Sequence, residues 1–287
     1  MMLGLLKGLS YLPLPVLYGI GDVVFILTFY LVRWRRKLAA ESLARSFPEK
    51  SEQERSWILR RHYRNLGRVL AEAVWGIRAD AENLRSRVEI ENPEVIKTYT
   101  ERGQSAVLMA AHFCNWEWLL LGGGFWLPMP VTAVYKSQRN EGIDHFLKKA
   151  RIRFGGTLIP HKTFAKEVFK RRHEVNVYAL VADQTPLKAD DKHWEYFLNQ
   201  DTAFFVGTGK LAKIVKAPVF FVAMRRLRRG YYTIRFEQIG EPPYESDSDT
   251  EIIGRYAKAL EREIRESPED WLWIHNKWKY AKPIDAE

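Results

Sequence analysis

The sequence lacks the residue patterns on which several common kinds of active site depend. Its 287 residues include one cysteine, which excludes a disulfide framework and a cysteine-rich zinc site and is typical of a reducing compartment. The seven histidines show no metal-binding spacing such as His-Glu-x-x-His, and no Gly-x-Ser-x-Gly turn is present for a serine nucleophile. The segment Gly207–Lys210 lacks the spacing of a nucleotide-binding phosphate loop. We therefore expect no bound metal and no cofactor.

Acidic residues are scarce relative to basic ones. The 45 Lys and Arg residues exceed the 35 Asp and Glu residues, which gives a formal net charge of +10. This excess favours anionic partners, such as phospholipid headgroups, phosphorylated substrates, an acidic carrier protein or nucleic acid. The ten tryptophans favour a membrane interface over duplex DNA, because indole rings are enriched where a bilayer meets water.

The N-terminal part of the chain contains one long apolar run. From Leu9 to Val32 the only charged residue is Asp22, and a bilayer core needs about 20 apolar residues as a helix. Prolines, glycines and Asp22 interrupt the run, and an acid at the middle of a membrane costs on the order of 3 kcal/mol. The run predicts a membrane-anchoring helix that either spans the bilayer or lies in its surface, with a buried core helix as a third alternative. The basic residues within 33–37 place the rest of the chain on the cytoplasmic side.

The remainder of the chain divides into two regions by pattern. Residues 38–79 carry apolar side chains at helical spacing, and the arginines between them form either a solvated face or a surface for anionic lipid. From residue 105 the pattern changes to short apolar segments that alternate with helical ones. We therefore expect an anchor over 1–37, a helical region over 38–104 and an α/β core over 105–287, with the last two forming one domain.

Strands and helices are expected to alternate through the core. The predicted strands are Ser105–Ala111, Val131–Tyr135, Thr157–Ile159, Asn176–Ala182 and Pro218–Met224, the last in a hairpin with Tyr231–Glu237. The predicted helices are Trp116–Leu121, ended by Gly122–Gly124, then Gly142–Phe154, Thr163–Arg172, Gly207–Val215 and Thr250–Glu266. This alternation indicates an α/β fold with a largely parallel sheet.

One predicted strand, Ser105–Ala111, leads directly into His112-Phe-Cys-Asn-Trp-Glu117. Reactive side chains of α/β folds collect beyond the carboxyl ends of strands. His112 suits a general base that takes a proton from a hydroxyl, and Glu117 suits a carboxylate that orients the ring. Five residues on a helix turn through about 500°, so the two meet only if His112 lies in the turn and Glu117 in the first helical turn. Asn115 would then be the N-cap between them.

The segment around His112 and Glu117 resembles a motif of a known enzyme superfamily. The segment AHFCNWEW is similar to the His-x4-Asp/Glu motif of the lysophospholipid-acyltransferase-like superfamily, and the wider sequence resembles the lipid A late acyltransferases (lauroyl and myristoyl transferases). Four further segments resemble theirs in the same order: VTAVYKSQRNEGIDHFLKKARIRFGG, NVYALVADQTP, FFVGTGKLAKIVKAPVFFVAMRR and WLWIHNKWKY. The resemblance therefore extends over nearly the whole chain.

The resemblance implies roles for particular residues. The implied catalytic residues are His112, as general base, and Glu117, as its partner. The implied substrate-binding residues are Lys136, Arg139, Arg151, Arg153 and Asp183. Two positions depart from the family pattern: Lys136 stands where arginine is common, and Thr185 stands at the second acid of an Asp-x-Asp pattern that begins at Asp183. An ammonium group still attracts a phosphate but loses the two-point contact of a guanidinium.

The resemblance also implies a reaction and a setting. The expected enzyme has a glycerol-phosphate-acyltransferase-like αβ domain with a mixed, largely parallel sheet. It moves a fatty acyl chain from an acyl thioester, on an acyl carrier protein or coenzyme A, to a hydroxyl of a lipid A precursor in lipopolysaccharide biosynthesis. It lies at the bacterial inner membrane with its catalytic domain on the cytoplasmic side. Two alternatives remain: an acyltransferase for an aminoacyl lipid, a phosphatidylinositol mannoside or a lysophospholipid, and a non-catalytic lipid-binding protein.

The positive charge is concentrated in two runs. Residues 148–172 contain nine basic residues and one acidic residue, a net +8, and residues 210–229 contain seven basic residues and none that are acidic. Each run alone is typical of a solvated face, and together they predict an anion-binding surface for acceptor phosphates, headgroups or an acidic carrier. A nucleic-acid partner is not expected, because it leaves the apolar N-terminus unexplained.

Overall fold

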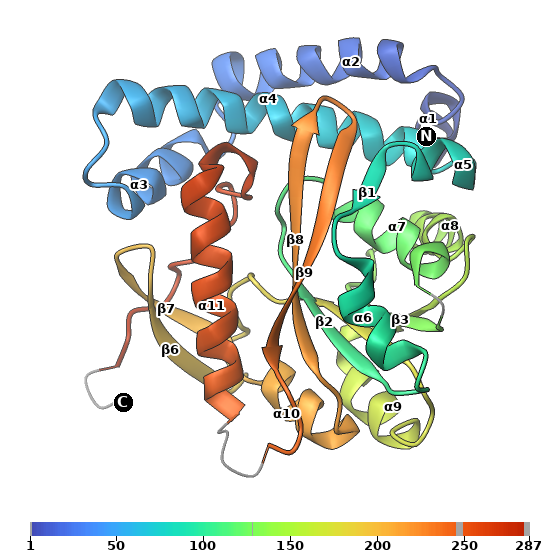
Figure 1. Cartoon of the computed structure of the whole chain (residues 1–287). Coiled ribbons are helices and arrows are strands. Elements are labelled where there is room, and N and C mark those ends of the chain that lie inside the picture. The colour runs from blue at the N-terminus through green and yellow to red at the C-terminus, as the bar shows by residue number, and fades with distance from the viewer. Residues whose placement is uncertain (1, 128, 245–248, 284–287) are drawn as a thin grey trace.

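A seven-stranded mixed sheet forms the centre of the protein. The computed structural model describes residues 2–127, 129–244 and 249–283 (Figure 1). The strand order is β1-β9-β8-β2-β5-β3-β4. Strands β8, β2, β5, β3 and β4 run parallel to one another, whereas β9 is antiparallel to β8 and β1 follows the direction of β9. The predicted α/β class with a largely parallel sheet is therefore confirmed.

Six strands of this sheet lie close to their predicted positions, whereas β1 falls in the 38–104 region that was expected to be helical. Their bounds are β1 (Val88–Ile90), β2 (Ala106–Ala110), β3 (Val131–Tyr135), β4 (Thr157–Pro160), β5 (Val177–Val181), β8 (Val219–Arg228) and β9 (Tyr231–Gly240). Strands β2 and β5 are apolar along most of their length and occupy the interior of the sheet, as expected for strands covered on both faces.

A separate hairpin was not expected from the sequence. It consists of β6 (Lys192–Phe197) and β7 (Gln200–Phe205), which pair with each other and with no other strand of the described residues. The two residues between them, Leu198 and Asn199, both have positive φ values, of 50° and 62°. Such tight turns usually contain glycine, and the Leu-Asn pair gives little local signal.

The helices of the core also follow the predicted order. They are α7 (Trp116–Trp126), α8 (Glu141–Arg151), α9 (Phe164–Lys170), α10 (Gly207–Val215) and α11 (Asp249–Glu266), with short 3₁₀ turns η2 (His161–Thr163) and η3 (Pro268–Asp270). The predicted end of α7 at Gly122–Gly124 is wrong, because the helix continues to Trp126. A Cβ atom on Gly124 would lie 2.5 Å from the Phe154 carbonyl oxygen, so this glycine permits close packing instead of ending the helix.

The region before the sheet is helical but is not continuous. Helices α3 (Arg36–Ser46) and α4 (Glu52–Gly76) are separated by a short turn, and α5 (Ala81–Arg85) and α6 (Pro93–Thr100) follow. The Ser51 hydroxyl accepts a hydrogen bond from the Glu54 backbone, and the Glu54 side chain accepts one from the Ser51 backbone. This capping box begins α4, and its Ser-x-x-Glu pattern is visible in the sequence.

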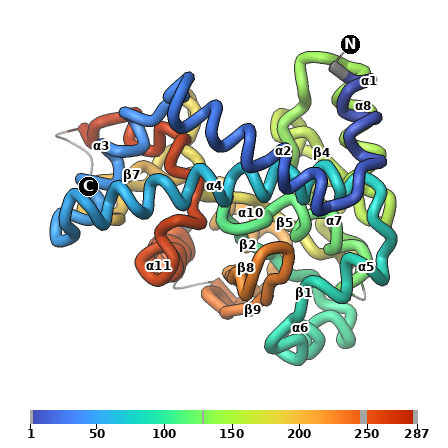
Figure 2. Tube along the Cα trace, turned by 90° about the horizontal axis from the view of Figure 1, so that it is seen from above, coloured from blue at the N-terminus to red at the C-terminus, as the bar shows by residue number. Residues whose placement is uncertain are grey.

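The predicted apolar run forms the outermost helical layer. After α1 (Met2–Leu9), α2 (Leu14–Ile26) continues into η1 (Leu27–Leu31), a short π-helical segment. Figure 1 shows α2 along α4 at one end of the molecule, and Figure 2 shows from above that α2 crosses over α4. By length and composition alone, Leu14–Leu31 is a candidate membrane span, with about a third of it buried. The outer residues of the expected 1–37 and 105–287 regions, Met1 and 284–287, lie outside the described residues.

Candidate active site

Two neighbouring parallel strands bring His112 and Asp183 together. In the β2–β5 pair, Ala110 lies opposite Val181, and each polar residue follows two positions later in its own chain segment. His112 Nδ1 lies 2.8 Å from Asp183 Oδ1. Because a carboxylate only accepts hydrogen bonds, Nδ1 carries the proton and Nε2 keeps a free lone pair. This tautomer is the one that a general base requires.

Asp183 is buried and both of its oxygens have partners. Its side chain is 4% exposed, and Oδ2 accepts a hydrogen bond of 2.9 Å from Trp271 Nε1. Burial by itself raises the pKa of this carboxyl. The charge of His112 and the hydrogen bonds from His112 and Trp271 outweigh burial and lower the pKa to about 2. Asp183 is therefore ionised at neutral pH and stabilises a protonated His112 ring.

The second ring nitrogen of His112 faces the accessible side of the site. Gln184 Nε2 lies 3.2 Å from His112 Nε2, and the free lone pair makes the Gln184 amide the donor. Burial lowers the pKa of His112, whereas the charges of Asp183 and Glu117 and the Asp183 hydrogen bond raise it, so the net shift of this pKa is upward. The raised pKa means that this environment favours the protonated ring more than water does, as stabilisation of an imidazolium requires.

Glu117 lies in the first turn of α7, as expected, but its carboxylate is directed at Arg151 of α8. Arg151 Nη2 lies 2.7 Å from Glu117 Oε1 and Arg151 Nε lies 3.1 Å from Oε2, a two-point ion pair. Within the described chain, no hydrogen bond joins Glu117 to the His112 ring. Glu117 instead acts on the ring through its charge, and Arg151 lies next to the site with its guanidinium already paired.

The turn between His112 and α7 is rigidly held. Asn115 caps α7 as predicted: its Oδ1 accepts from the Trp118 backbone N–H at 3.0 Å, and its Nδ2 donates to Glu72 of α4 at 2.7 Å. Cys114 has a positive φ of 50° and is buried. Burial raises the pKa of the Cys114 thiol, which disfavours a thiolate nucleophile.

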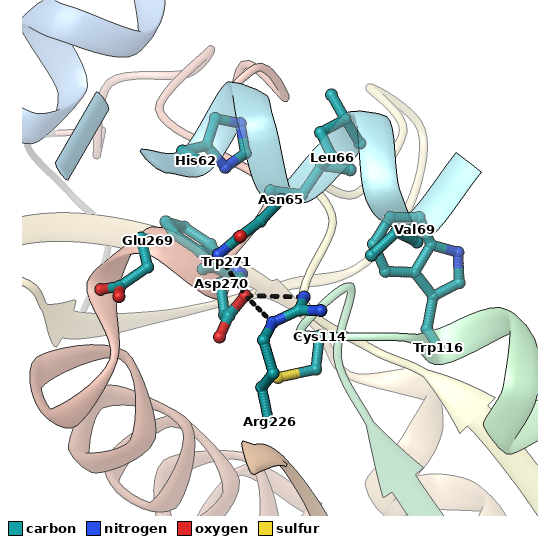
Figure 3. Close-up of a pocket in the computed structure, with 11 residues that line it drawn as sticks. His62, Asn65, Leu66, Val69, Cys114, Trp116, Arg226, Glu269, Asp270 and Trp271 are labelled. Carbon is teal, nitrogen blue, oxygen red and sulfur yellow. Dashed lines mark hydrogen bonds and ion pairs between the residues drawn. The ribbon is translucent and has the colours of Figure 1, made fainter. Parts of the chain in front are cut away.

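A buried polar cluster fixes this turn to α4 and to the C-terminal segment. Figure 3 shows the guanidinium of Arg226 against Asp270, with Nη2 2.9 Å from Oδ1. Asn65 of α4 donates to the same oxygen at 2.9 Å, and the Cys114 backbone N–H donates to the Asp270 carbonyl at 2.9 Å. Asp270 directly precedes Trp271, the donor to Asp183. The cluster thus helps to position His112 and Asp183 together.

An apolar cavity of about 110 Å³ lies between α7 and one face of the sheet. From the strands it is lined by hydrophobic residues, which are Ile90, Leu108, Ala110, Val131, Ala133, Val134, Ala179, Leu180, Val181, Val222, Ile234 and Phe236. From α7 it is lined by Trp116, Leu119, Leu120, Gly123 and Trp126. The ring of Trp116 lies 5.3 Å from that of His112, centroid to centroid, so the cavity adjoins His112. Its lining is entirely apolar and suits a hydrocarbon chain.

The other predicted substrate-binding residues have different surroundings. Lys136 and Arg139 are exposed just beyond β3, which lies next to β5 in the sheet. The Arg153 guanidinium instead donates to the carbonyl oxygens of Gly76, at 2.8 Å, and Ala79. Arg153 therefore satisfies backbone carbonyls at the carboxyl end of α4. These contacts stabilise the end of the helix.

Part of the second basic run is also paired internally. Arg225 lies 2.8 Å from Glu263 and 2.7 Å from Glu266, and Arg226 belongs to the buried cluster with Asp270. The run 210–229 therefore contributes less free positive charge than its composition indicates.

Sequence reasoning did not single out Gln184 or Trp271. Gln184 directly follows Asp183, but no spacing rule identifies a side chain that folds back over a ring from a neighbouring strand. Trp271 lies in WLWIHNKWKY, whose several tryptophans are equivalent as sequence. Only the tertiary contact from its indole N–H to Asp183 distinguishes it.

The model of the family described as "Bacterial lipid A biosynthesis acyltransferase" matches residues 1–280. The lipid A biosynthesis palmitoleoyltransferase of Escherichia coli is 24% identical over 283 residues, which cover 98% of this chain and 90% of the relative. The lauroyltransferase of the same pathway in Escherichia coli is 26% identical over 282 residues, 96% of this chain and 90% of the relative. The lipid A biosynthesis myristoyltransferase of Escherichia coli is 24% identical over 266 residues, which cover 88% of this chain and 77% of the relative.

Proposed function

Because the chain belongs to the bacterial lipid A biosynthesis acyltransferase family, we propose that it transfers a fatty acyl chain from an acyl thioester to a hydroxyl of a lipid A precursor. The observation that carries this proposal is the His112–Asp183–Trp271 chain beside an apolar cavity. The position of His112 after β2 of a mixed sheet also supports a glycerol-phosphate-acyltransferase-like domain.

The proposed reaction uses His112 as the proton acceptor and donor. Nε2 takes the proton of the acceptor hydroxyl, whose oxygen attacks the thioester carbonyl and forms a C–O bond. The carbonyl becomes a tetrahedral oxyanion, which collapses as the C–S bond breaks, and the leaving thiolate takes the proton from the imidazolium. Asp183 stabilises the imidazolium between these steps. Gln184 occupies the place of the acceptor hydroxyl at Nε2 and must move aside when the acceptor binds.

The surroundings of His112 support an acyl thioester as the donor and a phosphorylated lipid as the acceptor. The cavity between α7 and the sheet accepts the acyl chain with its carboxyl end near Trp116 and His112. The exposed Lys136 and Arg139 are positioned to attract phosphate groups of the acceptor. The exposed lysines of α8 and α9 favour an acidic acyl carrier protein as donor over coenzyme A. The arginines that follow the apolar run favour the cytoplasmic side of the inner membrane.

Lipid mass spectrometry of a deletion strain tests the acceptor. We expect lipid A that lacks one acyl chain in the deletion strain, with the chain restored by the wild-type gene and not by His112→Ala. The abundance of the His112→Ala protein in membranes serves as the control for folding. A change confined to aminoacyl lipids, phosphatidylinositol mannosides or lysophospholipids would contradict the lipid A assignment. Normal acylation by His112→Ala would contradict the assignment of the base.

A further inference from the structure

Helix α2 and the η1 segment have one buried face and one exposed apolar face. The buried face carries Leu14, Leu17, Tyr18, Gly21, Phe25 and Phe29. The exposed face carries Val16, Ile20, Val23, Leu27 and Leu31, which recur every three or four residues and are between 36% and 69% exposed. An apolar stripe of this length is unusual on a protein surface that faces water. It is called the outer stripe below.

The buried face is joined to α4 along the length of α2, so the two helices form one unit. Tyr18 donates a hydrogen bond of 2.8 Å to Glu72. Gly21 lies so close to Gly67 that a Cβ atom on Gly21 would be 2.6 Å from the Gly67 carbonyl oxygen. Any position of α2 in a membrane therefore also places α4.

The composition of α4 does not allow this unit to cross a bilayer. Arg60, Arg61 and Arg64 are exposed on α4, and Arg64 pairs with Asp22 in the middle of α2 at 3.3 Å. A spanning α2 would carry these charges into the hydrocarbon, at a cost of several kcal/mol for each on insertion scales. A helix that lies in the interface buries only its outer stripe and leaves the charges of α4 in the headgroup region.

The surroundings of the outer stripe match a lipid headgroup layer. Trp34, which follows the stripe, is 46% exposed, and Trp57 on α4 is 53% exposed with Arg61 4.6 Å from its ring. Exposed arginines and a lysine follow the stripe within 33–37. Indole rings favour the bilayer interface, and each basic residue near an anionic surface adds attraction. A second copy of this chain would present the same positive rim and would be repelled.

We infer that the outer stripe of α2 and η1 lies in the cytoplasmic surface of an anionic bilayer, parallel to the membrane plane, and that this helix does not span the membrane. Helix α4 lies across the edge of the sheet at which β2 and β5 end. His112 and Asp183, which follow these strand ends, then lie on the lipid side of the molecule. This inference shares membrane association with the proposed function but does not depend on the chemistry.

Cysteine accessibility distinguishes the two orientations. Gly4 and Gln53 are exposed, and the single native cysteine is buried, so Gly4→Cys and Gln53→Cys each provide one reactive thiol in the full-length protein. In intact cells we expect a membrane-impermeant maleimide to label neither variant, and after permeabilisation to label both. Labelling of Gly4→Cys from outside intact cells would place the N-terminus across the membrane and overturn the inference.

Vesicle binding tests the outer stripe itself. The probe is a vesicle of phosphatidylethanolamine and phosphatidylglycerol that contains neither acceptor nor donor, so the result does not depend on catalysis. We expect Val23→Asp to weaken binding by about tenfold or more, because a charge replaces an apolar contact. Tyr196→Asp is the matched control: Tyr196 is 71% exposed on β6, away from α2 and outside both basic runs, and its substitution should leave binding unchanged.

Sedimentation and circular dichroism of the same variants complete the test. Because Val23 and Tyr196 are both exposed, we expect the Val23→Asp and Tyr196→Asp proteins to keep the native fold. Equal vesicle binding by Val23→Asp and the wild type would overturn the inference. Loss of a wild-type dimer in Val23→Asp without loss of vesicle binding would overturn it too, because the stripe would then be a contact between two copies.

Discussion

At the scale of single residues, the two nitrogens of His112 have opposite neighbours. Nδ1 faces an ionised carboxylate, Asp183, and Nε2 faces an amide donor, Gln184. The carboxylate favours the protonated ring, whereas the amide favours the neutral ring, because its hydrogen bond is lost when Nε2 takes a proton. The proton affinity of the His112 ring therefore depends on both contacts.

Asp183→Asn should slow acyl transfer by as much as about 10⁴-fold, by analogy with the loss of the orienting carboxylate in other histidine bases. The substitution also removes the charge that raises the pKa of His112. General-base activity falls as pH drops through the pKa of the base, so the acid limb of the kcat/KM profile should move to lower pH. Measurement of kcat/KM against pH checks both effects.

Gln184→Ala provides the matched comparison at the other nitrogen. Without the amide donor the protonated ring is favoured, so the acid limb should move to higher pH, with a loss of rate far smaller than in Asp183→Asn. Shifts in the same direction for both variants would contradict the assigned tautomer. The sequence predicted Glu117 as the orienting residue, and the same profile for Glu117→Gln measures its influence on the ring.

At the scale of elements, the close contact of α2 with α4 depends on two glycines. A Cβ atom on Gly67 would lie 2.4 Å from the Gly21 carbonyl oxygen, a distance that requires the helices to separate. Gly19, two residues from Gly21 in α2, has no atom within 4 Å of a Cβ atom. Substitution of Gly67 therefore tests the packing between the helices, whereas substitution of Gly19 tests only the helix propensity of α2.

Gly67→Ala should lower the free energy of unfolding by about 1–3 kcal/mol, the usual cost of overpacking. Gly19→Ala should raise the same free energy by about 0.5–1 kcal/mol, because alanine loses less conformational entropy than glycine in a helix. Denaturant unfolding of both variants in detergent measures these changes. A stabilised Gly67→Ala protein would show that α2 does not pack against α4 at this point.

At the scale of the whole molecule, the C-terminal segment joins parts that are distant in sequence. Lys277 is buried, and its ammonium group donates to the Ala203 carbonyl in β7 at 2.9 Å. The Thr185 hydroxyl, just after Asp183, lies 2.8 Å from the Asn276 carbonyl oxygen. The second acid position of the family pattern is therefore a contact between the site loop and the chain's end.

Lys277 should make stability depend on pH. Burial lowers the pKa of its amine from 10.5 to about 7, so above pH 7 the unfolded chain binds a proton that the folded protein does not. The free energy of unfolding due to this residue should rise as pH increases from about 7 to about 10. Unfolding at pH 7 and at pH 9 should show this rise in the wild type and a smaller rise in Lys277→Met. An equal rise in both proteins would contradict the buried position of Lys277.

Much of this organisation was determined by the sequence alone. Apolar runs bounded by turn residues predicted β2, β5 and the α/β class, because a strand that is buried on both faces consists mostly of apolar residues. The position of His112 at a strand end and the Asn115 cap followed from the same local rules. The apolar run before Arg33 also predicted a membrane anchor, but it left the orientation of that helix open.

The tertiary structure decided which of these residues meet. Spacing within one segment paired His112 with Glu117, whereas the β2–β5 register placed Asp183 at the ring and α8 placed Arg151 at Glu117. The orientation of α2 likewise depends on its contact with the charged helix α4. Local sequence specifies which strands and helices form, but the neighbour of each one is selected by packing between segments far apart in the chain. In this protein, that packing determines both the partner of the His112 ring and the face of α2 that stays exposed.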